Sequence, residues 1–252
     1  MTVVLTLEVA DRIERALAAA GAARVLGVAS VAGNPLELET WRFGDVLADR
    51  VARAVGHYHY FSGPRELRDA NVGEVATLVE WYRGCPLFVR LAPVFASEVL
   101  LGELHGAGLR QSNFMSLFVG APSVAQPEAN VHEVPKGQRQ DFVELWRSET
   151  PALLEAEFSR GWRCYVANGD GTPAAYGALY IADRVAVCAA AATLPEFRGR
   201  GLQTALLRKR INDAHEAGCD LIAVQASPAS ASERNLRRVG MALAYTKAIW
   251  TW

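Results

Sequence analysis

The second half of the chain alternates short apolar runs with amphipathic segments, and turn residues separate them. Short apolar runs between turn residues, or apolar positions every second residue, indicate strands, whereas spacings of three and four indicate helices. The run 184–194 could be helix or strand by composition alone, and Pro195 after it together with the strand before it favours a strand. Ser230 and Glu233 form a capping box at the start of the last helix, and Gly218 follows the helix before it. The predicted strands are 162–168, 174–182, 184–194, 220–227 and 242–250, and the predicted helices are 143–161, 202–218 and 230–240. Strands alternating with helices in this order predict an α/β fold.

The first half repeats part of this order. A strand at 86–93, a helix at 97–108 and a strand at 109–120 correspond to the strand, helix and strand that end the second half. This correspondence predicts a diverged duplication. The polar, proline-bearing connector 120–137 separates the two copies. We therefore expect two domains, one at 1–125 and one at 126–252.

The stretch 194–204, LPEFRGRGLQT, places two glycines and two arginines directly before a predicted helix. A helix N-terminus exposes unpaired N–H groups and partial positive charge, and a glycine turn lets a phosphate approach the backbone closely. Three interpretations compete: a phosphate cradle, a basic nucleic-acid patch and an ordinary polar loop. The first half has no counterpart of this turn.

Charge and composition bear on the choice. The net charge is −1, so the field of the whole molecule offers no case for nucleic acid or an anionic membrane as partner. No run of about 18 apolar residues predicts a membrane span, and the N-terminus lacks the pattern of a secretory leader. Cys85, Cys164, Cys188 and Cys219 are scattered and form no zinc spacing. They predict reduced thiols, a cytoplasmic protein and no bound metal.

Two other phosphate motifs fit the turn poorly. The run GRGLQT has Thr204 where the dinucleotide fingerprint has its third glycine, and Asp220 precedes a strand where that fingerprint needs an acid after one. A Walker loop would need Gly-Lys-Ser/Thr, which is absent from the sequence.

The segment TLPEFRGRGLQTALL resembles the pyrophosphate loop of the GCN5-related N-acetyltransferase (GNAT) superfamily, whose pattern is Arg/Gln-x-x-Gly-x-Gly/Ala. Arg198, Gly201 and Gln203 occupy the pattern positions, and Gln203 departs from the final Gly/Ala. The resemblance extends over about residues 138–252, and the first half is similar to a degenerate second copy, as in tandem members. It implies a tandem GNAT fold with mixed central sheets flanked by helices. Because the first copy lacks the arginine-glycine turn, we expect only the second copy to bind acetyl-CoA.

The resemblance implies a V-shaped gap between the strands 185–194 and 221–227, which holds the pantetheine arm. A bulge near Cys188–Ala190 would direct a backbone N–H at the thioester oxygen. The alanines of this strand also suit tight packing between sheet and helix. The implied acetyl-CoA-binding residues are Ala192, Thr193, Leu194, Arg198, Gly199, Arg200, Gly201, Leu202, Gln203, Thr204 and Asn235.

The chemistry needs a base for the amine and an acid for the leaving thiolate. Glu149, Glu155, Glu157 and Glu196 are candidate bases, although each also reads as a solvated charge. Leu236 stands where the family usually has the tyrosine that protonates the thiolate, and Tyr245 on the last strand is the candidate substitute.

Two further groups have simple alternatives. Cys188 lacks an adjacent base and reads as a buried thiol rather than a nucleophile. His57 and His59 lie on one side of a potential strand, where they would contact the acceptor or simply pack, and they lack a third metal ligand nearby.

The sequence therefore predicts an acetyl-CoA-dependent N-acetyltransferase that acylates an amine of a small molecule or peptide by direct attack. The alternative is a CoA-binding sensor or scaffold without turnover, which the absent tyrosine favours. The acceptor, the acyl-chain length and the oligomeric state stay open.

Overall fold

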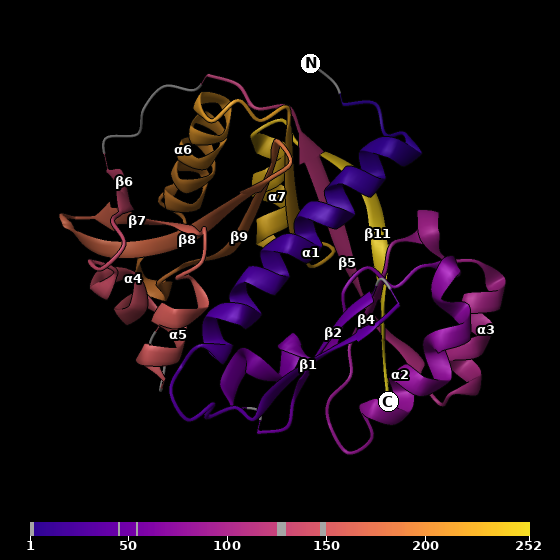
Figure 1. Cartoon of the computed structure of the whole chain (residues 1–252). Coiled ribbons are helices and arrows are strands. Elements are labelled where there is room, and N and C mark those ends of the chain that lie inside the picture. Colours follow the sequence, from indigo (N-terminus) through magenta and orange to yellow (C-terminus); the bar gives the residue numbers. More distant parts are fainter. Residues whose placement is uncertain (1–2, 45, 54, 125–129, 147–149) are drawn as a thin grey trace.

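A computed structural model describes residues 3–44, 46–53, 55–124, 130–146 and 150–252. Its main feature is an eight-stranded mixed sheet with the order β4-β11-β5-β10-β9-β8-β7-β6 (Figure 1). The strands of the second half are β6 (Val131–Val134), β7 (Arg163–Gly169), β8 (Thr172–Ala182), β9 (Val185–Thr193), β10 (Leu221–Ala226) and β11 (Ala242–Thr251). The five strands predicted for this half are confirmed, and β6 lies inside the segment expected to be a connector.

Helices cover both faces of this sheet. On β9 and β10, Val185, Val187 and Ala223 pack under one layer of helices, whereas Ala186 and Cys188 pack under the other. This alternation follows from the two-residue period of a strand. The first layer is α1 (Leu7–Ala29), α4 (Gln140–Leu145) and α5 (Pro151–Glu157), and the second is α6 (Leu202–Glu216) and α7 (Ala231–Arg238).

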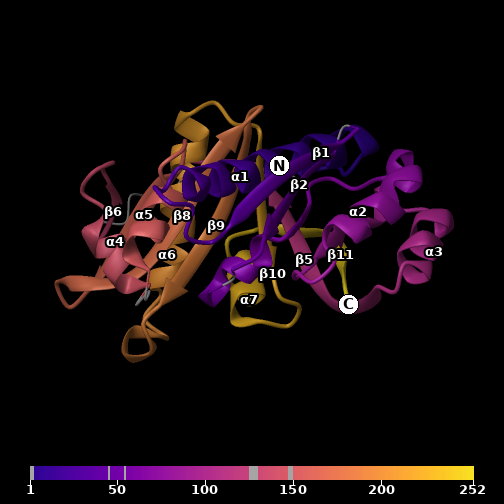
Figure 2. The ribbon, with the colours of Figure 1, turned by 60° about the horizontal axis from the view of Figure 1, so that its bottom comes forward.

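Helix α1 belongs to the first half of the chain but packs on the sheet of the second, crossing β8 and β9 (Figures 1 and 2). Thr6 caps its N-terminus by accepting a hydrogen bond from Val9 N–H. Ala10, Ile13 and Ala16 are buried along one stripe. This helix was not predicted, because its many alanines give the buried stripe little contrast with the other positions.

The two halves exchange strands. In the first half, β4 (Val89–Leu91) and β5 (Arg110–Gly120) flank α3 (Glu98–Gly106), just as β10 and β11 flank α7. Strand β5 inserts between β10 and β11, and β11 in turn inserts between β5 and β4, with every pair antiparallel. The boundary expected at residue 125 is therefore not a boundary in the sheet, because each half supplies a strand to the other. Residues 125 and 126 themselves lie outside the described ranges.

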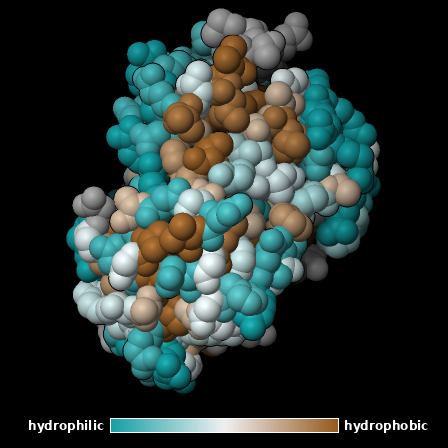
Figure 3. Space-filling view, turned by 90° about the vertical axis from the view of Figure 1, so that its right-hand side faces the viewer, coloured by the Kyte–Doolittle hydropathy of each residue, from teal (hydrophilic) through white to brown (hydrophobic). Residues whose placement is uncertain are grey.

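The rest of the first half forms a smaller sheet beside β4. Its strands have the order β1-β2-β3, and Phe88 N–H donates to Ser62 O at 3.1 Å to join it to the chain entering β4. Figure 3 views the molecule from the side of α2 and α3, where apolar residues form patches separated by polar ones. The elements are β1 (Leu38–Phe43), β2 (Val46–Val51), β3 (Gly63–Pro64), α2 (Val75–Trp81) and the 3₁₀ turns Gly56–Phe61, Asp69–Glu74 and Pro93–Phe95.

Two local predictions were wrong. The helix expected at 143–161 is instead α4 and α5, and Thr150 before Pro151 has φ −130° and ψ 65° because a residue preceding proline avoids the helical region. The strand suggested around His57 and His59 is the 3₁₀ turn Gly56–Phe61.

Candidate active site

The glycine-arginine turn leads directly into α6. Gly199 and Gly201 have φ of 78° and 80°, in the left-handed region that glycine adopts without steric cost. Gly201 is the N-cap residue of α6, and no side chain caps this end. The first hydrogen bond of the helix runs from Ala205 N–H to Gly201 O at 3.0 Å. The amides of residues 202–204 are therefore available to an anion.

A groove of about 650 Å³ opens at this helix terminus and runs from β9 to α7. All the predicted acetyl-CoA-binding residues except Leu194 and Arg200 line it. The lining residues are Ala191, Ala192, Thr193, Phe197, Arg198, Gly199, Gly201, Leu202, Gln203, Thr204, Ala231, Ser232, Arg234, Asn235 and Arg238. The structure thus gathers residues from the end of β9, the turn and α7 around one cavity.

The two exceptions have other partners. Leu194 N–H donates to Ala174 O at 2.9 Å, so this amide is already used within the sheet. The Arg200 guanidinium donates to Asp170 at 2.6 Å and lies 5.0 Å from the centre of the Phe197 ring. Arg200 therefore braces the turn against the loop between β7 and β8 instead of facing the groove.

Two arginines of α7, Arg234 and Arg238, line the groove together with Arg198. Neither was among the predicted binding residues. Arg234 donates to Ala229 O at 3.0 Å, and Arg238 donates to Asn235 Oδ1 at 2.8 Å. Within the described ranges, none of these three arginines forms a salt bridge with a carboxylate. Three exposed cations beside an uncapped helix terminus suit a ligand with several phosphate charges. Arg234 and Arg238 are four positions apart and so lie on the same face of α7, which is a pattern that the sequence does contain.

Strands β9 and β10 separate next to the groove. Their parallel pairing runs from Leu221 opposite Val185 to Val224 opposite Cys188 and stops there. Beyond it β9 continues to Thr193, whereas β10 pairs onward only with β5. The pairing of these strands therefore ends at the position where the V-shaped gap is expected.

The expected bulge in β9 is confirmed, shifted toward Ala191. Ala178 pairs with Ala189 and Tyr176 with Ala192, so Ala190 and Ala191 together oppose Gly177. Ala190 has φ 50°, which is uncommon for a residue with a Cβ. Such a bulge turns a backbone N–H out of the sheet ladder, where it is free to meet a ligand.

The residues considered for the acid lie on opposite faces of the sheet. Leu236 of α7 is fully buried on the face of the sheet that α6 covers, where it packs in the apolar core. Tyr245 faces α1, where its hydroxyl donates to Glu14 Oε1 at 2.6 Å, and Lys247 donates to Glu14 Oε2. Burial and the Glu14 carboxylate raise the pKa of Tyr245. Tyr245 does not line the groove, and its role as the acid stays a prediction.

Of the carboxylates considered as bases, Glu157 is not a solvated charge. It is fully buried on α5, where Arg24 of α1 donates to its Oε1 and His57 Nε2 lies 2.9 Å from its Oε2. Glu155 and Glu196 are exposed, and Glu149 lies outside the described residues. A partly exposed imidazole held by a buried carboxylate can accept a proton at its second nitrogen. The sequence could not reveal this pairing because its members are 133 and 100 positions apart.

Aromatic contacts connect His57 to the strand next to the bulge. The His57 ring lies 5.1 Å from the Trp146 ring, which stacks on Tyr176 at 5.0 Å. Tyr176 pairs with Ala192 across β8 and β9. Burial, reinforced by Glu157, raises the pKa of Tyr176 to about 12, so its phenol stays protonated near neutral pH. Two ring contacts therefore lead from His57 of the first half to the residue of β8 that pairs with Ala192, beside the bulge.

The remaining candidate groups read simply. Cys188 is a buried thiol whose pKa burial raises, as expected for a packed and unreactive cysteine. The described part of the chain contains no cluster of three metal-ligating side chains. Nor does any helix in that part have the length and apolar character needed to cross a bilayer.

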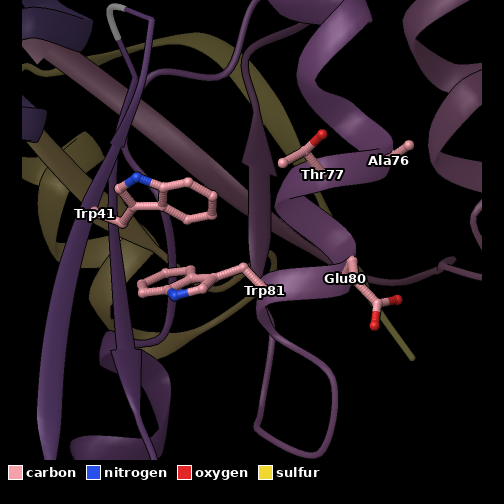
Figure 4. Close-up of a pocket in the computed structure, with 5 residues that line it drawn as sticks. All are labelled: Trp41, Ala76, Thr77, Glu80 and Trp81. Carbon is pink, nitrogen blue, oxygen red and sulfur yellow. The ribbon is translucent and has the colours of Figure 1, made fainter.

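A second hollow, of about 470 Å³, lies in the first half between β1 and α2 (Figure 4). Trp41 and Trp81 meet there edge to face with ring centres 5.7 Å apart, and Thr77 and Glu80 line the α2 side. The Arg50 guanidinium lies 4.9 Å from the Trp81 ring centre. This hollow shares no lining residue with the groove at α6.

A splayed pair of parallel strands, a bulge in the first of them and a glycine turn before the next helix define the acyl-CoA N-acyltransferase fold. Residues 131–241 match the sequence model of the Acetyltransferase (GNAT) family. The chain thus carries a GNAT domain in its second half. No curated protein sequence matches it.

Solved structures agree with this fold. A GCN5-related N-acetyltransferase from Kribbella flavida superposes with a TM-score of 0.65 at 19% identity, covering 93% of this chain and 94% of that one. A tandem GNAT protein from the clavulanic acid biosynthesis pathway has a TM-score of 0.58 at 16% identity over 91% and 86% of the two chains. A putative GNAT-family acetyltransferase from Novosphingobium aromaticivorans has a TM-score of 0.54 at 19% identity over 90% and 96%.

Proposed function

We propose that this protein transfers the acetyl group of acetyl-CoA to an amine of a small molecule or peptide. The observation that carries the proposal is the groove at the N-terminus of α6, which lies beside the gap between β9 and β10. The open amides and Arg198, Arg234 and Arg238 would hold the CoA phosphates, and the gap would admit the pantetheine arm. The residues present therefore fit this substrate.

The reaction would be direct transfer. The amine nitrogen attacks the thioester carbon, the new C–N bond forms as the C–S bond breaks, and the electron pair leaves on sulfur as CoA thiolate. The proton lost by the amine would pass to His57, directly or through water, and solvent would protonate the thiolate where needed. A thiol with a reference pKa of about 8.5 leaves without much assistance.

The acceptor would bind on the α1 face of the sheet, between the two halves. His57 and Glu157 support this position, because one comes from each half and both adjoin the aromatic path to β8. The exchanged strands β5 and β11 support the interpretation of the first half as a degenerate GNAT copy that shapes this site. A cytoplasmic location stays part of the proposal.

Two observations favour the alternative, a CoA-binding sensor or scaffold. Leu236 is buried where the family resemblance leads us to expect a tyrosine, and the Tyr245 hydroxyl is bonded to Glu14. Thiol release from acetyl-CoA, followed with a thiol reagent over a panel of primary amines and peptides, tests the two functions. Amine-dependent release supports the transferase. Tight acetyl-CoA binding without release over the panel supports the alternative, and failure to bind acetyl-CoA contradicts both.

A further inference from the structure

Arg210 of α6 is one of the charged residues buried in the interior. Its side chain is fully buried, with 1% of the residue exposed, between α6 and the sheet. No carboxylate of the described chain pairs with it. A buried cation without a counter-ion is costly unless its donors are used. The hydrogen bonds of the guanidinium N–H groups therefore have to offset the cost of burying Arg210.

The guanidinium donates to main-chain carbonyls around the bulge. Its Nε donates to Leu206 O of the same helix at 3.0 Å, and one terminal nitrogen lies 3.2 Å from Ala178 O and 3.4 Å from Ala189 O. Ala178 and Ala189 are the last regular pair before the bulge. The other terminal nitrogen is buried without a hydrogen-bond partner. Arg210 therefore joins the two strands at the position where the bulge interrupts their ladder.

The opposing residue is shaped for this guanidinium. Gly177 faces the bulge, and a Cβ built on it would lie 2.9 Å from the Arg210 Cζ and 3.0 Å from a terminal nitrogen. Any larger residue would push the guanidinium from the two carbonyls. Gly177 has ordinary φ, so the space for Arg210, and not backbone strain, explains the glycine.

We propose that Arg210 is a positioning residue that orients the bulge N–H toward the acyl carbonyl of bound acetyl-CoA. A trans peptide is planar, so its carbonyl and N–H point in opposite directions. By binding Ala189 O from the α6 side, Arg210 directs Ala190 N–H away from that side, into the gap. It also polarises this peptide, because a chain of hydrogen bonds in a low-dielectric interior strengthens its members.

The charge of Arg210 adds to this effect. It lies close enough to Cys188, where β9 and β10 part, to oppose the rise that burial causes in the pKa of that thiol. The same positive charge would favour negative charge on the thioester oxygen and on the departing sulfur. It would thereby replace part of the assistance that a tyrosine at position 236 would give. This inference rests on the proposed function, since it needs acetyl-CoA in the gap.

Calorimetric titration with acetyl-CoA and with CoA tests the inference without an acceptor. In Arg210→Met we expect CoA affinity within about threefold of wild type and a further loss of about 2- to 10-fold for acetyl-CoA, the value of one hydrogen bond to its carbonyl. Isotope-edited infrared spectroscopy of acetyl-CoA labelled at the carbonyl carbon should show the bound C=O stretch moving to higher frequency in Arg210→Met, because the hydrogen bond is weakened. Arg210→Lys should restore part of both effects.

Ile211→Val, which trims the neighbouring apolar side chain of the same helix and leaves Arg210 in place, is the control and should leave both readouts unchanged. If Arg210→Met does not fold, Gly177→Ala provides the test, because its Cβ displaces the guanidinium while Arg210 is retained. An unchanged affinity ratio and an unchanged carbonyl stretch in a folded variant would overturn the inference while leaving acetyl-CoA binding intact. If wild type binds no acetyl-CoA, the proposed function fails first.

Discussion

The Tyr245 hydroxyl donates to Glu14 at 2.6 Å across 231 positions of sequence. The bond joins the last strand of the second half to the first helix of the chain, and Lys247 binds the other oxygen of the same carboxylate. Glu14 and Lys247 are both buried. This group links the two halves at the face where the acceptor is proposed to bind, and it ties the last strand of the second half to the first helix of the chain.

Tyr245→Phe separates a structural hydroxyl from a catalytic one. We expect a loss of about 1–3 kcal/mol in the free energy of unfolding, because Glu14 Oε1 loses its donor in a buried site. The single-turnover rate of acetyl transfer should stay within about threefold of wild type. A fall of 10²–10⁴-fold, the range of a general acid, would instead assign the proton to Tyr245.

Gly201→Glu should sharply weaken acetyl-CoA binding. The new carboxylate would stand at the open end of α6 and repel the pyrophosphate, while its Cβ would meet no neighbouring atom. Gly218→Glu is the matched control, since Gly218 has φ 74° at the other end of the same helix and equally open surroundings. Calorimetry on both variants decides the matter, and wild-type affinity in folded Gly201→Glu would refute the phosphate site.

One chain should bind one CoA. The first half has no arginine-glycine turn, and the 3₁₀ turn that leads into α2 begins with Asp69, whose negative charge would disfavour a phosphate there. Titration of a chain of known active concentration with CoA measures the stoichiometry. Two sites of similar affinity would contradict the asymmetry between the halves.

His57→Gln tests the proposed base. The amide can still donate to Glu157 but cannot take a proton, so we expect acceptor-dependent transfer to fall by about 10²–10⁴-fold with CoA affinity unchanged. His59→Gln is the control, because His59 lies in the same 3₁₀ turn and its ring nitrogen is placed 2.6 Å from Gly56 O instead. Equal rates in the two variants would exclude His57 as the base.

The buried Asp49 carboxyl should make the free energy of unfolding depend on pH in a known direction. Burial raises its pKa above 3.8 despite the Arg65 guanidinium at 2.6 Å, and its second oxygen has no partner. Because the pKa of Asp49 is higher in the folded chain than in the unfolded chain, the folded chain binds more protons between the two pKa values. The contribution of Asp49 to stability is therefore present at low pH and is lost as the pH rises through its folded-state pKa. Between about pH 3.8 and that value, wild type should gain stability on acidification relative to Asp49→Asn, as denaturant unfolding at several pH values would measure. The opposite slope would contradict the raised pKa.

The sequence by itself determined most of the GNAT domain. Local signals specify its elements: apolar runs between turn residues for β7 to β10, apolar alternation for β11, the Ser230 cap of α7, and the glycines before α6, which have positive φ. The groove residues at 198–204 are close in sequence, so a short motif was enough to predict that they lie together. Leu194 and Arg200 were the exceptions, because their partners Ala174 and Asp170 come from another hairpin.

The tertiary structure alone decided how the halves combine. The insertion of β5 between β10 and β11, and the packing of α1 on the second sheet, depend on contacts more than a hundred residues apart, which no local periodicity encodes. Glu157 read as a solvated helix charge until Arg24 and His57 were brought to it from the other half. In the sequence, Arg210 is one of several charged residues of the predicted helix 202–218, and nothing marks it as buried. Its burial and its hydrogen bonds to the carbonyls of Ala178 and Ala189 depend on the pairing register of β8 and β9, which places the bulge opposite Gly177.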